Sequence, residues 1–346
     1  GNVFRRCVPP TDNSSAQAHT MPAAQASTVA HLPPVHRELV NDIRCSPSAP
    51  SVTFTASEDR NVGMFDWNKR EVVTQWSCHK SGVNKLAVAK SGAIVFSSSR
   101  DKTAVQMSTT GPAQQTFSGH ELTVSGIATS ADARVLCTGS RDASVRSWDV
   151  ETGACTTSKT IAQNLVTCMR WIPDSSCVLQ ASEDLRLRVW DSRSLEVVEV
   201  FQGHNNIQLW CDVNADGNLL ASCSNGFDGA GCEIKVWDRR TRGLLHDLPG
   251  HTQSVTAVVF VGSRPMLVSS SADSSLRVWD VNTATCLSQL TVPTDDRVYC
   301  LDTAAVSSDA HAVYGGSLSG ALSKWLLEPN GQIRLTATTE QTATDQ

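Results

Sequence analysis

The chain has 346 residues, of which 40% are hydrophobic and 18% are charged, and its formal net charge is −5. This apolar content supports a large folded core. The charge balance argues against nucleic acid as a partner, because such binding usually needs a basic field. No apolar run approaches 18 residues and no secretory core segment is present, so we expect a cytoplasmic protein without a membrane-spanning helix.

The cysteine content is high for such a protein. None of the 12 cysteines forms a C-x-x-C pair, and several, such as Cys137, Cys168 and Cys300, lie inside apolar runs. This pattern favours buried reduced thiols over a disulfide framework.

Residues 1–34 are rich in Ala, Ser, Gln, Thr and Pro and show no sustained periodicity, which predicts a flexible N-terminal arm. Gly1 and Cys7 are candidates for lipidation, Gly1 by a myristoyl group. Two lipid groups, or one together with the neighbouring arginines, would give peripheral membrane association. Arg5 stands where the myristoylation pattern has Ser or Thr, so an unmodified start is the alternative.

From residue 36 onward the sequence repeats. Seven equivalent apolar positions lie 41 to 47 residues apart, at Phe65, Met107, Trp148, Trp190, Trp237, Trp279 and Trp325. Residues 254–292 divide into four β-rich runs separated by Gly, Ser, Asp or Asn turns. A period near 40–45 with Gly-His at the front and Trp-Asp at the back resembles the WD40 repeat. We therefore predict an all-β protein, a seven-bladed WD40 β-propeller.

The last repeat must close the ring. Its third strand is predicted at 321–327, and a turn at 328–331 leads to an outer strand at 332–339. A strand at 27–32 is the alternative occupant of the same edge. We favour the C-terminal hairpin because local pairing costs less loop-closure entropy. The predicted propeller spans 35–340, and 341–346 form a tail.

A histidine, a hydroxyl residue, an aspartate and a tryptophan recur at fixed offsets. The full set is present as His120, Thr138, Asp142 and Trp148, and again as His251, Ser269, Asp273 and Trp279. Two further repeats carry the first three groups, as His36, Thr55 and Asp59 and as His79, Ser97 and Asp101. One such set suggests a catalytic triad, but an enzyme needs one active site and a fold needs every blade held. In the WD40 family these groups form a buried hydrogen-bonded chain, so we interpret them as a structural network.

The fifth repeat carries an insertion of about five residues before Trp237, with Asn225, Phe227 and Asp228 in it. We expect these residues to contact a partner, with tolerated surface variation as the alternative. Other candidates lie beside the turn aspartates and have mixed charge, which suits recognition of a specific protein: Arg100, Arg141, Glu183 and Arg186.

No cofactor, metal or small-molecule substrate is predicted. The glycines of the insertion match no phosphate-binding loop, and the stretch from Asp212 to Gly217 lacks the glutamate that a calcium loop needs at its twelfth position, Cys223. Cys223 and Cys232 bracket the insertion, but two cysteines alone give a weak metal or disulfide signal.

A propeller enzyme is the remote alternative, and it would need a unique polar group of residues in the central channel. The aligned positions of the inner strands are apolar, at Ile43, Leu86, Ile127, Met169, Cys211, Val258 and Cys300. We therefore expect no such group, and predict a protein that is not an enzyme.

Within the WD40 proteins, the chain resembles the family of WD repeat-containing protein 31. The residues that carry the resemblance are 137–142, 179–184, 189–192 and, above all, 222–227 with 231–233 before Trp237 and Asp238. The resemblance implies a non-enzymatic scaffold or adaptor in cilium or flagellum assembly and ciliary trafficking, with ciliary or trafficking proteins as partners. A substrate adaptor of a ubiquitin ligase or a signalling complex is the alternative.

Overall fold

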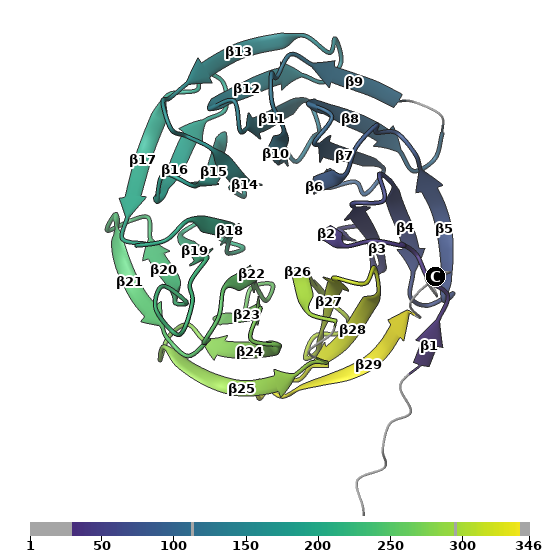
Figure 1. Cartoon of the computed structure of the whole chain (residues 1–346), viewed down its shortest axis with the longest axis vertical. Helices are drawn as coiled ribbons and strands as arrows, with labels where there is room; N and C mark the ends of the chain where they lie inside the picture. Colours follow the sequence, from purple (N-terminus) through teal and green to yellow (C-terminus); the bar gives the residue numbers. More distant parts are fainter. Residues whose placement is uncertain (1–29, 112–113, 294–295, 340–346) are drawn as a thin grey trace, which may run out of the picture.

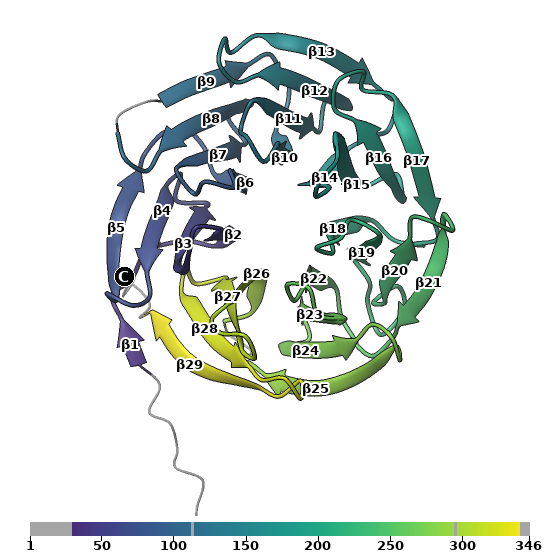
Figure 2. The same cartoon turned by 180° about the vertical axis from the view of Figure 1, so that it is seen from behind.

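The computed structural model describes residues 30–111, 114–293 and 296–339. These residues form seven separate sheets arranged in a ring (Figure 1). No helix is present in these three ranges, and the opposite face of the molecule shows the same closed ring (Figure 2). The predicted all-β, seven-bladed propeller is therefore confirmed.

Each sheet is one blade, and the four strands of each repeat follow one another in sequence order from the inside of the ring outward (Figure 1). Blade 1 comprises β2 (Val40–Ser46), β3 (Ala49–Ser57), β4 (Val62–Asp66) and β5 (Glu71–Trp76). Blade 2 comprises β6 (Val83–Val88), β7 (Ile94–Ser99), β8 (Thr103–Ser108) and β9 (Gln114–Ser118). Blade 3 comprises β10 (Val124–Thr129), β11 (Val135–Ser140), β12 (Ser144–Asp149) and β13 (Cys155–Thr160).

The other blades are built in the same way. Blade 4 comprises β14 (Val166–Trp171), β15 (Cys177–Ser182), β16 (Arg186–Asp191) and β17 (Val197–Gln202). Blade 5 comprises β18 (Gln208–Val213), β19 (Leu219–Ser224), β20 (Ile234–Asp238) and β21 (Gly243–Leu248). Blade 6 comprises β22 (Val255–Phe260), β23 (Met266–Ser271), β24 (Ser275–Asp280) and β25 (Thr285–Thr291). Blade 7 comprises β26 (Val298–Ala305), β27 (His311–Ser317), β28 (Leu322–Leu327) and β29 (Ile333–Thr339).

The burial pattern explains why the blades need one another. The second strand of a blade, such as β11 or β23, is buried at nearly every position, so both faces of the sheet are covered by neighbouring blades. The outermost strand is far more exposed, as β13 shows. The core therefore lies between the blades.

The last blade closes with both predicted strands. β29 pairs antiparallel with β28, as the C-terminal hairpin predicts, and the N-terminal strand β1 (Ala30–Leu32) adds a fifth, parallel strand outside it. Leu32 is buried in this position. The two candidate strands therefore do not compete. β29 pairs with β28 along one edge, and its other edge is free to pair with β1.

The observed start of the propeller differs from the predicted boundary at residue 35. The sequence composition predicts residues 30–34 as part of the flexible arm, but β1 belongs to the sheet of blade 7. A three-residue strand has too short a pattern to stand out from its polar surroundings. The lipidation candidates Gly1 and Cys7 and the predicted tail at 341–346 lie outside the described residues.

Candidate functional site

The loops that join the second and third strands of each blade, and those that lead from one blade into the next, lie on one face of the ring, here called the loop face. In blade 3, His120 Nδ1 lies 2.9 Å from Asp142 Oδ2, and its Nε2 lies 2.8 Å from Thr138 Oγ1. The Trp148 indole donates to the same hydroxyl at 2.8 Å. Because the hydroxyl accepts from the indole, it can donate to His120 Nε2, which leaves Nδ1–H to donate to the carboxylate.

Blade 6 repeats the network. His251 lies 2.9 Å from Asp273 and 2.8 Å from Ser269, and the Trp279 indole donates to Ser269 at 2.8 Å. Blades 1 and 2 contain the same histidine, hydroxyl and aspartate contacts, with distances between 2.7 and 2.9 Å. Four copies of one buried, fully paired arrangement are a framework feature, which gives no blade a distinct chemistry.

The network fixes the charge state of its members. Burial alone would raise the pKa of Asp142, but hydrogen bonds from Ser144, the Glu121 amide and His120 outweigh it and lower this pKa to about 2. Burial lowers the pKa of His120, against the opposing effect of Asp142. A carboxylate and a neutral imidazole are therefore the stable pair at neutral pH.

Blade 4 contains a substitute network that sequence reasoning missed. Gln180 accepts the Trp190 indole at 2.6 Å and donates to Asn164 at 2.6 Å. Arg188 then donates to Asn164 at 2.9 Å and to Asp184 at 3.0 Å. The signal in the sequence is that Gln180 precedes Trp190 by the same interval as Thr138 precedes Trp148.

Blade 5 has only part of the network. His204 lies 2.8 Å from Ser222, which also accepts the Trp237 indole at 2.9 Å. No described residue pairs with His204 Nδ1, because the insertion occupies the place of the turn aspartate. Burial, followed by the field of Lys235, lowers the pKa of His204 to about 3. Blade 5 therefore lacks the stabilising carboxylate of the turn and has a different loop in its place.

That loop is a tight hairpin. Phe227 and Ala230 exchange two backbone hydrogen bonds of 3.0 Å, and the Gly229 amide donates to the Thr252 carbonyl at 2.9 Å in the next inter-blade loop. A Cβ atom on Gly226 would lie 2.3 Å from the Gly231 carbonyl, so only glycine fits there. The hairpin holds the Phe227 side chain 68% exposed on the loop face.

The other candidate contact residues also lie on the loop face. Arg100 reaches Glu58 of blade 1 at 2.6 Å, and Arg141 reaches Glu183 of blade 4 at 2.7 Å. Both arginine side chains are still about half exposed, at 54% and 47%. Arg186, Asn225 and Asp228 are exposed. The mixed charge of this rim is therefore partly used to join neighbouring blades.

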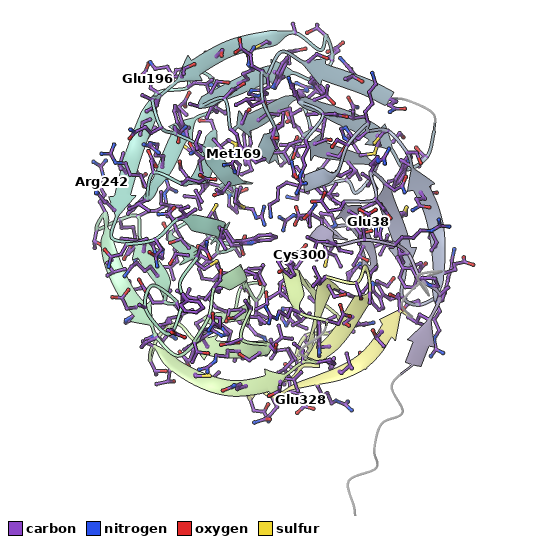
Figure 3. All side chains as sticks on the ribbon, in the orientation of Figure 1. Glu38, Met169, Glu196, Arg242, Cys300 and Glu328 are labelled. Atoms are coloured by element: carbon purple, nitrogen blue, oxygen red, sulfur yellow. The ribbon has the colours of Figure 1, made fainter. Side chains whose placement is uncertain are left out.

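The prediction that the inner strands bring no polar group to the channel is wrong. The seven positions named are buried apolar side chains, and the strand register aligns Leu301 with them in place of Cys300. Successive side chains of a strand point to opposite faces of its sheet. The residues directly before and after these seven positions therefore point to the other face. These neighbours include Asp42, Arg44, Lys85, Arg170, Trp210, Asp212 and Asp302. Figure 3 shows Met169 and Cys300 on the inner strands, whereas Glu196 and Arg242 lie at the outer rim.

The channel carboxylates join neighbouring blades. Asp42 accepts the Leu86 amide of blade 2 at 2.8 Å, and Asp302 of blade 7 accepts the Cys45 amide of blade 1 at 2.7 Å. Asp212 accepts the Phe260 amide of blade 6 at 2.8 Å.

Two of these carboxylates also pair with arginines. Arg44 lies 3.1 Å from Asp42, and Arg170 lies 3.4 Å from Asp212. Burial raises the pKa of Asp212 to about 6, although Arg170 opposes the shift. These contacts give the carboxylates a structural role in closing the ring.

Across the described ranges, no cluster of three or more His, Cys, Asp or Glu side chains could hold a metal ion. The same part of the chain contains no helix that is long and apolar enough to cross a membrane.

The repeats match the model of a known protein family. The family model for the WD domain, G-beta repeat, matches residues 70–105, 111–149, 155–191, 195–238 and 242–280, which together make up more than half of the chain. The chain belongs to the WD40 family. Each matched WD40 span starts at or near the outer strand of one blade and ends in the third strand of the next, so every repeat covalently links two blades. Members of this family generally serve as scaffolds that bind other proteins, and no catalytic family is indicated.

Similar WD40 proteins come from several eukaryotes. Periodic tryptophan protein 2 of Arabidopsis thaliana is 29% identical over 60% of this chain and 22% of its own length. Nuclear distribution protein nudF 1 of Talaromyces marneffei is 34% identical over 36% of this chain and 27% of its own length. Nuclear distribution protein nudF of Aspergillus niger is 27% identical over 71% of this chain and 60% of its own length. The chain thus spans roughly a quarter of the length of the first two relatives.

Proposed function

We propose that this protein is a non-enzymatic scaffold that binds protein partners on its loop face. The observation that carries the proposal is the contrast between what the blades share and what they do not. The repeated His, hydroxyl and Asp groups are occupied in holding each blade together. Among the described residues, blade 5 alone carries an inserted, hydrogen-bonded hairpin, and this hairpin presents Phe227 to solvent.

An exposed aromatic side chain on a fixed backbone is well suited to binding. Its apolar area is still in contact with water, and little conformational entropy is lost when a partner covers it. Two further apolar side chains, Leu122 and Leu318, are 51% and 45% exposed on loops of the same face. The half-exposed arginines supply the polar rim that such interfaces have.

Affinity purification with matched variants tests the scaffold proposal. Phe227→Asp changes the loop face, and Leu244→Asp makes the same chemical change at a side chain that is 46% exposed on the outer strand β21. We expect Phe227→Asp to lose partners that both the wild type and Leu244→Asp retain. Retention of every partner by Phe227→Asp would overturn the proposal.

For the cellular role, we propose a place in cilium or flagellum assembly and ciliary trafficking, supported by the resemblance to the WD repeat-containing protein 31 family. Proximity labelling in ciliated cells tests this role. We expect transport and basal-body proteins to be enriched. Enrichment of ubiquitin-ligase subunits, signalling components or nuclear distribution proteins without ciliary ones would replace the ciliary role and leave the scaffold intact.

We also propose that Gly1 and Cys7 tether the scaffold to a membrane surface. Two acyl groups bind a bilayer far more stably than one. Intact mass of protein produced with an acyltransferase, compared with Gly1→Ala, tests the first modification. A mass that differs between the two only by the substitution would rule it out.

A further inference from the structure

A cavity of about 410 Å³ opens at the loop-face end of the central channel. The residues that line it come from five blades and include Asn41, Lys85, Trp210, Asn225, Thr256 and Tyr299. Asn225 belongs to the blade 5 insertion, so the cavity and the exposed Phe227 are two residues apart in the chain. The cavity and the exposed Phe227 therefore lie close enough for one partner segment to reach both.

Trp210 is one of the residues that line the cavity, and three cations lie near its ring. Lys85 Nζ lies 3.5 Å from the ring centroid, and the guanidinium carbons of Arg170 and Arg44 lie 5.0 and 5.4 Å from it. An indole face attracts cations, but it carries no net charge to neutralise them. Neutralisation must come from anionic groups, and the fields of Asp42 and of the Cys168 thiol are those that favour a charged Lys85.

The three channel carboxylates already have other partners. Asp42 pairs with Arg44, Asp212 pairs with Arg170, and Asp302 accepts the backbone amides of Cys45 and Thr303.

Among the residues that the structure describes, Lys85 lacks the acceptor that Arg44 and Arg170 each have. No described residue accepts a hydrogen bond from its ammonium group. The side chain is half-buried and lines the cavity. Burial lowers the pKa of Lys85, and the field of Asp42 only partly opposes this. A hydrogen-bond acceptor that enters the cavity would replace the contacts with water that the Lys85 ammonium group loses through burial.

We propose that this cavity binds a carboxylate of a protein partner, and that Lys85 is its ion-pair partner. The inference rests on the proposed scaffold function and specifies the chemistry that the loop face recognises, namely an acidic group next to an apolar one that covers Phe227. The volume holds an Asp or Glu side chain. A C-terminal carboxylate has the same chemistry, so the experiment must separate the two sources.

Peptide display on the full chain provides the probe. Random peptides selected on the wild type are synthesised in three forms: as selected, with the acidic residue changed to its amide, and with an amidated C-terminus. Fluorescence anisotropy then measures their affinity for the wild type and for Lys85→Gln, Lys85→Arg, Phe227→Ser and Lys90→Gln. Lys90 is an exposed lysine between β6 and β7, outside this cavity, and serves as the matched control.

We expect the selected peptides to share an acidic residue and to lose about tenfold or more in affinity for Lys85→Gln, but not for Lys90→Gln. Lys85→Arg keeps the positive charge and should retain most of the binding. This variant therefore distinguishes a loss of recognition in Lys85→Gln from damage to the fold. A loss on changing the acidic residue to its amide identifies a side-chain carboxylate, and a loss on amidation identifies the C-terminus.

The opposite results are equally clear. Peptides that depend on Phe227 but bind Lys85→Gln as well as the wild type would overturn the carboxylate site and leave the scaffold function standing. A shared basic residue would show that the cavity recognises cations, and would also overturn the site. Peptides that depend on neither residue, or no peptides at all, would contradict both proposals.

Discussion

At the scale of single residues, stability depends on carboxylates placed to satisfy several donors at once. Asp142 accepts hydrogen bonds from His120, the Glu121 amide and both the amide and hydroxyl of Ser144. A part-buried donor that loses its acceptor costs more than the bond itself contributed, because water does not fully replace it. The turn aspartate is therefore the most sensitive member of each network.

Asp142→Ala is expected to destabilise the protein by about 2 to 4 kcal/mol. Urea unfolding gives this value, and Asp132→Ala in the same blade is the control. Asp132 is 60% exposed and caps a surface turn, so its loss should cost less than about 1 kcal/mol. Equal values for the two variants would contradict the network account.

The same carboxylate predicts a loss of stability in acid. Because the folded pKa of Asp142 is about 2 against an ordinary value of 3.8, the unfolded chain takes up a proton first as the pH falls. The stabilisation is complete above about pH 4 and is lost between about pH 4 and pH 2. Unfolding free energies measured in that window should converge for the wild type and Asp142→Ala. A constant difference down to pH 2 would refute this assignment.

At the scale of elements, two features show how much the sequence reveals. The blades were predictable because their strands and turns recur in register with seven apolar positions. Residues that recur in several repeats serve the fold, which distinguishes them from residues that occur once. The channel charges are not predictable in this way, because the aligned apolar positions describe only one face of each inner strand. Asp42 and Lys85 lie one residue before positions that looked apolar. Pairing across blades, as between Asp302 and the Cys45 amide, depends on ring geometry that no local pattern encodes.

The blade 5 hairpin predicts different outcomes for two of its glycines. Gly229 has a φ of 77° but open space around its Cβ position, so Gly229→Ala should cost about 1 kcal/mol. At Gly226 a methyl group would collide with the Gly231 backbone, so Gly226→Ala should displace the loop. Hydrogen exchange at the Phe227 and Ala230 amides measures this. Slow exchange retained in Gly226→Ala would contradict the predicted displacement of the loop.

The fifth strand of blade 7 makes a further prediction. Leu32 on β1 is 4% exposed, and Leu32→Ala should destabilise the protein by about 2 to 3 kcal/mol. Leu122→Ala, at a side chain that is 51% exposed, is the control and should change stability by less than about 1 kcal/mol. Thermal unfolding compares the two. No difference between them would mean that β1 does not contribute to the folded ring in solution.

At the scale of the whole molecule, the ring separates stability from recognition. The matched WD40 spans cross from one blade to the next, and the channel carboxylates join blades 1, 2, 5, 6 and 7 through backbone amides. Seven interlocked blades keep the loops at fixed positions, so a partner meets a surface that is already organised. Loops can then vary, as the insertion in blade 5 does, without loss of the framework.

The central claim is that partners bind the loop face, and hydrogen exchange of a purified complex tests it most directly. The partner is the protein most enriched by the wild type and lost by Phe227→Asp. We expect protection to increase at 225–231, at 252–254 and around Leu318, and to stay unchanged on the outer strands β13, β17 and β21. Protection confined to those outer strands, with the loop face unchanged, would contradict the account.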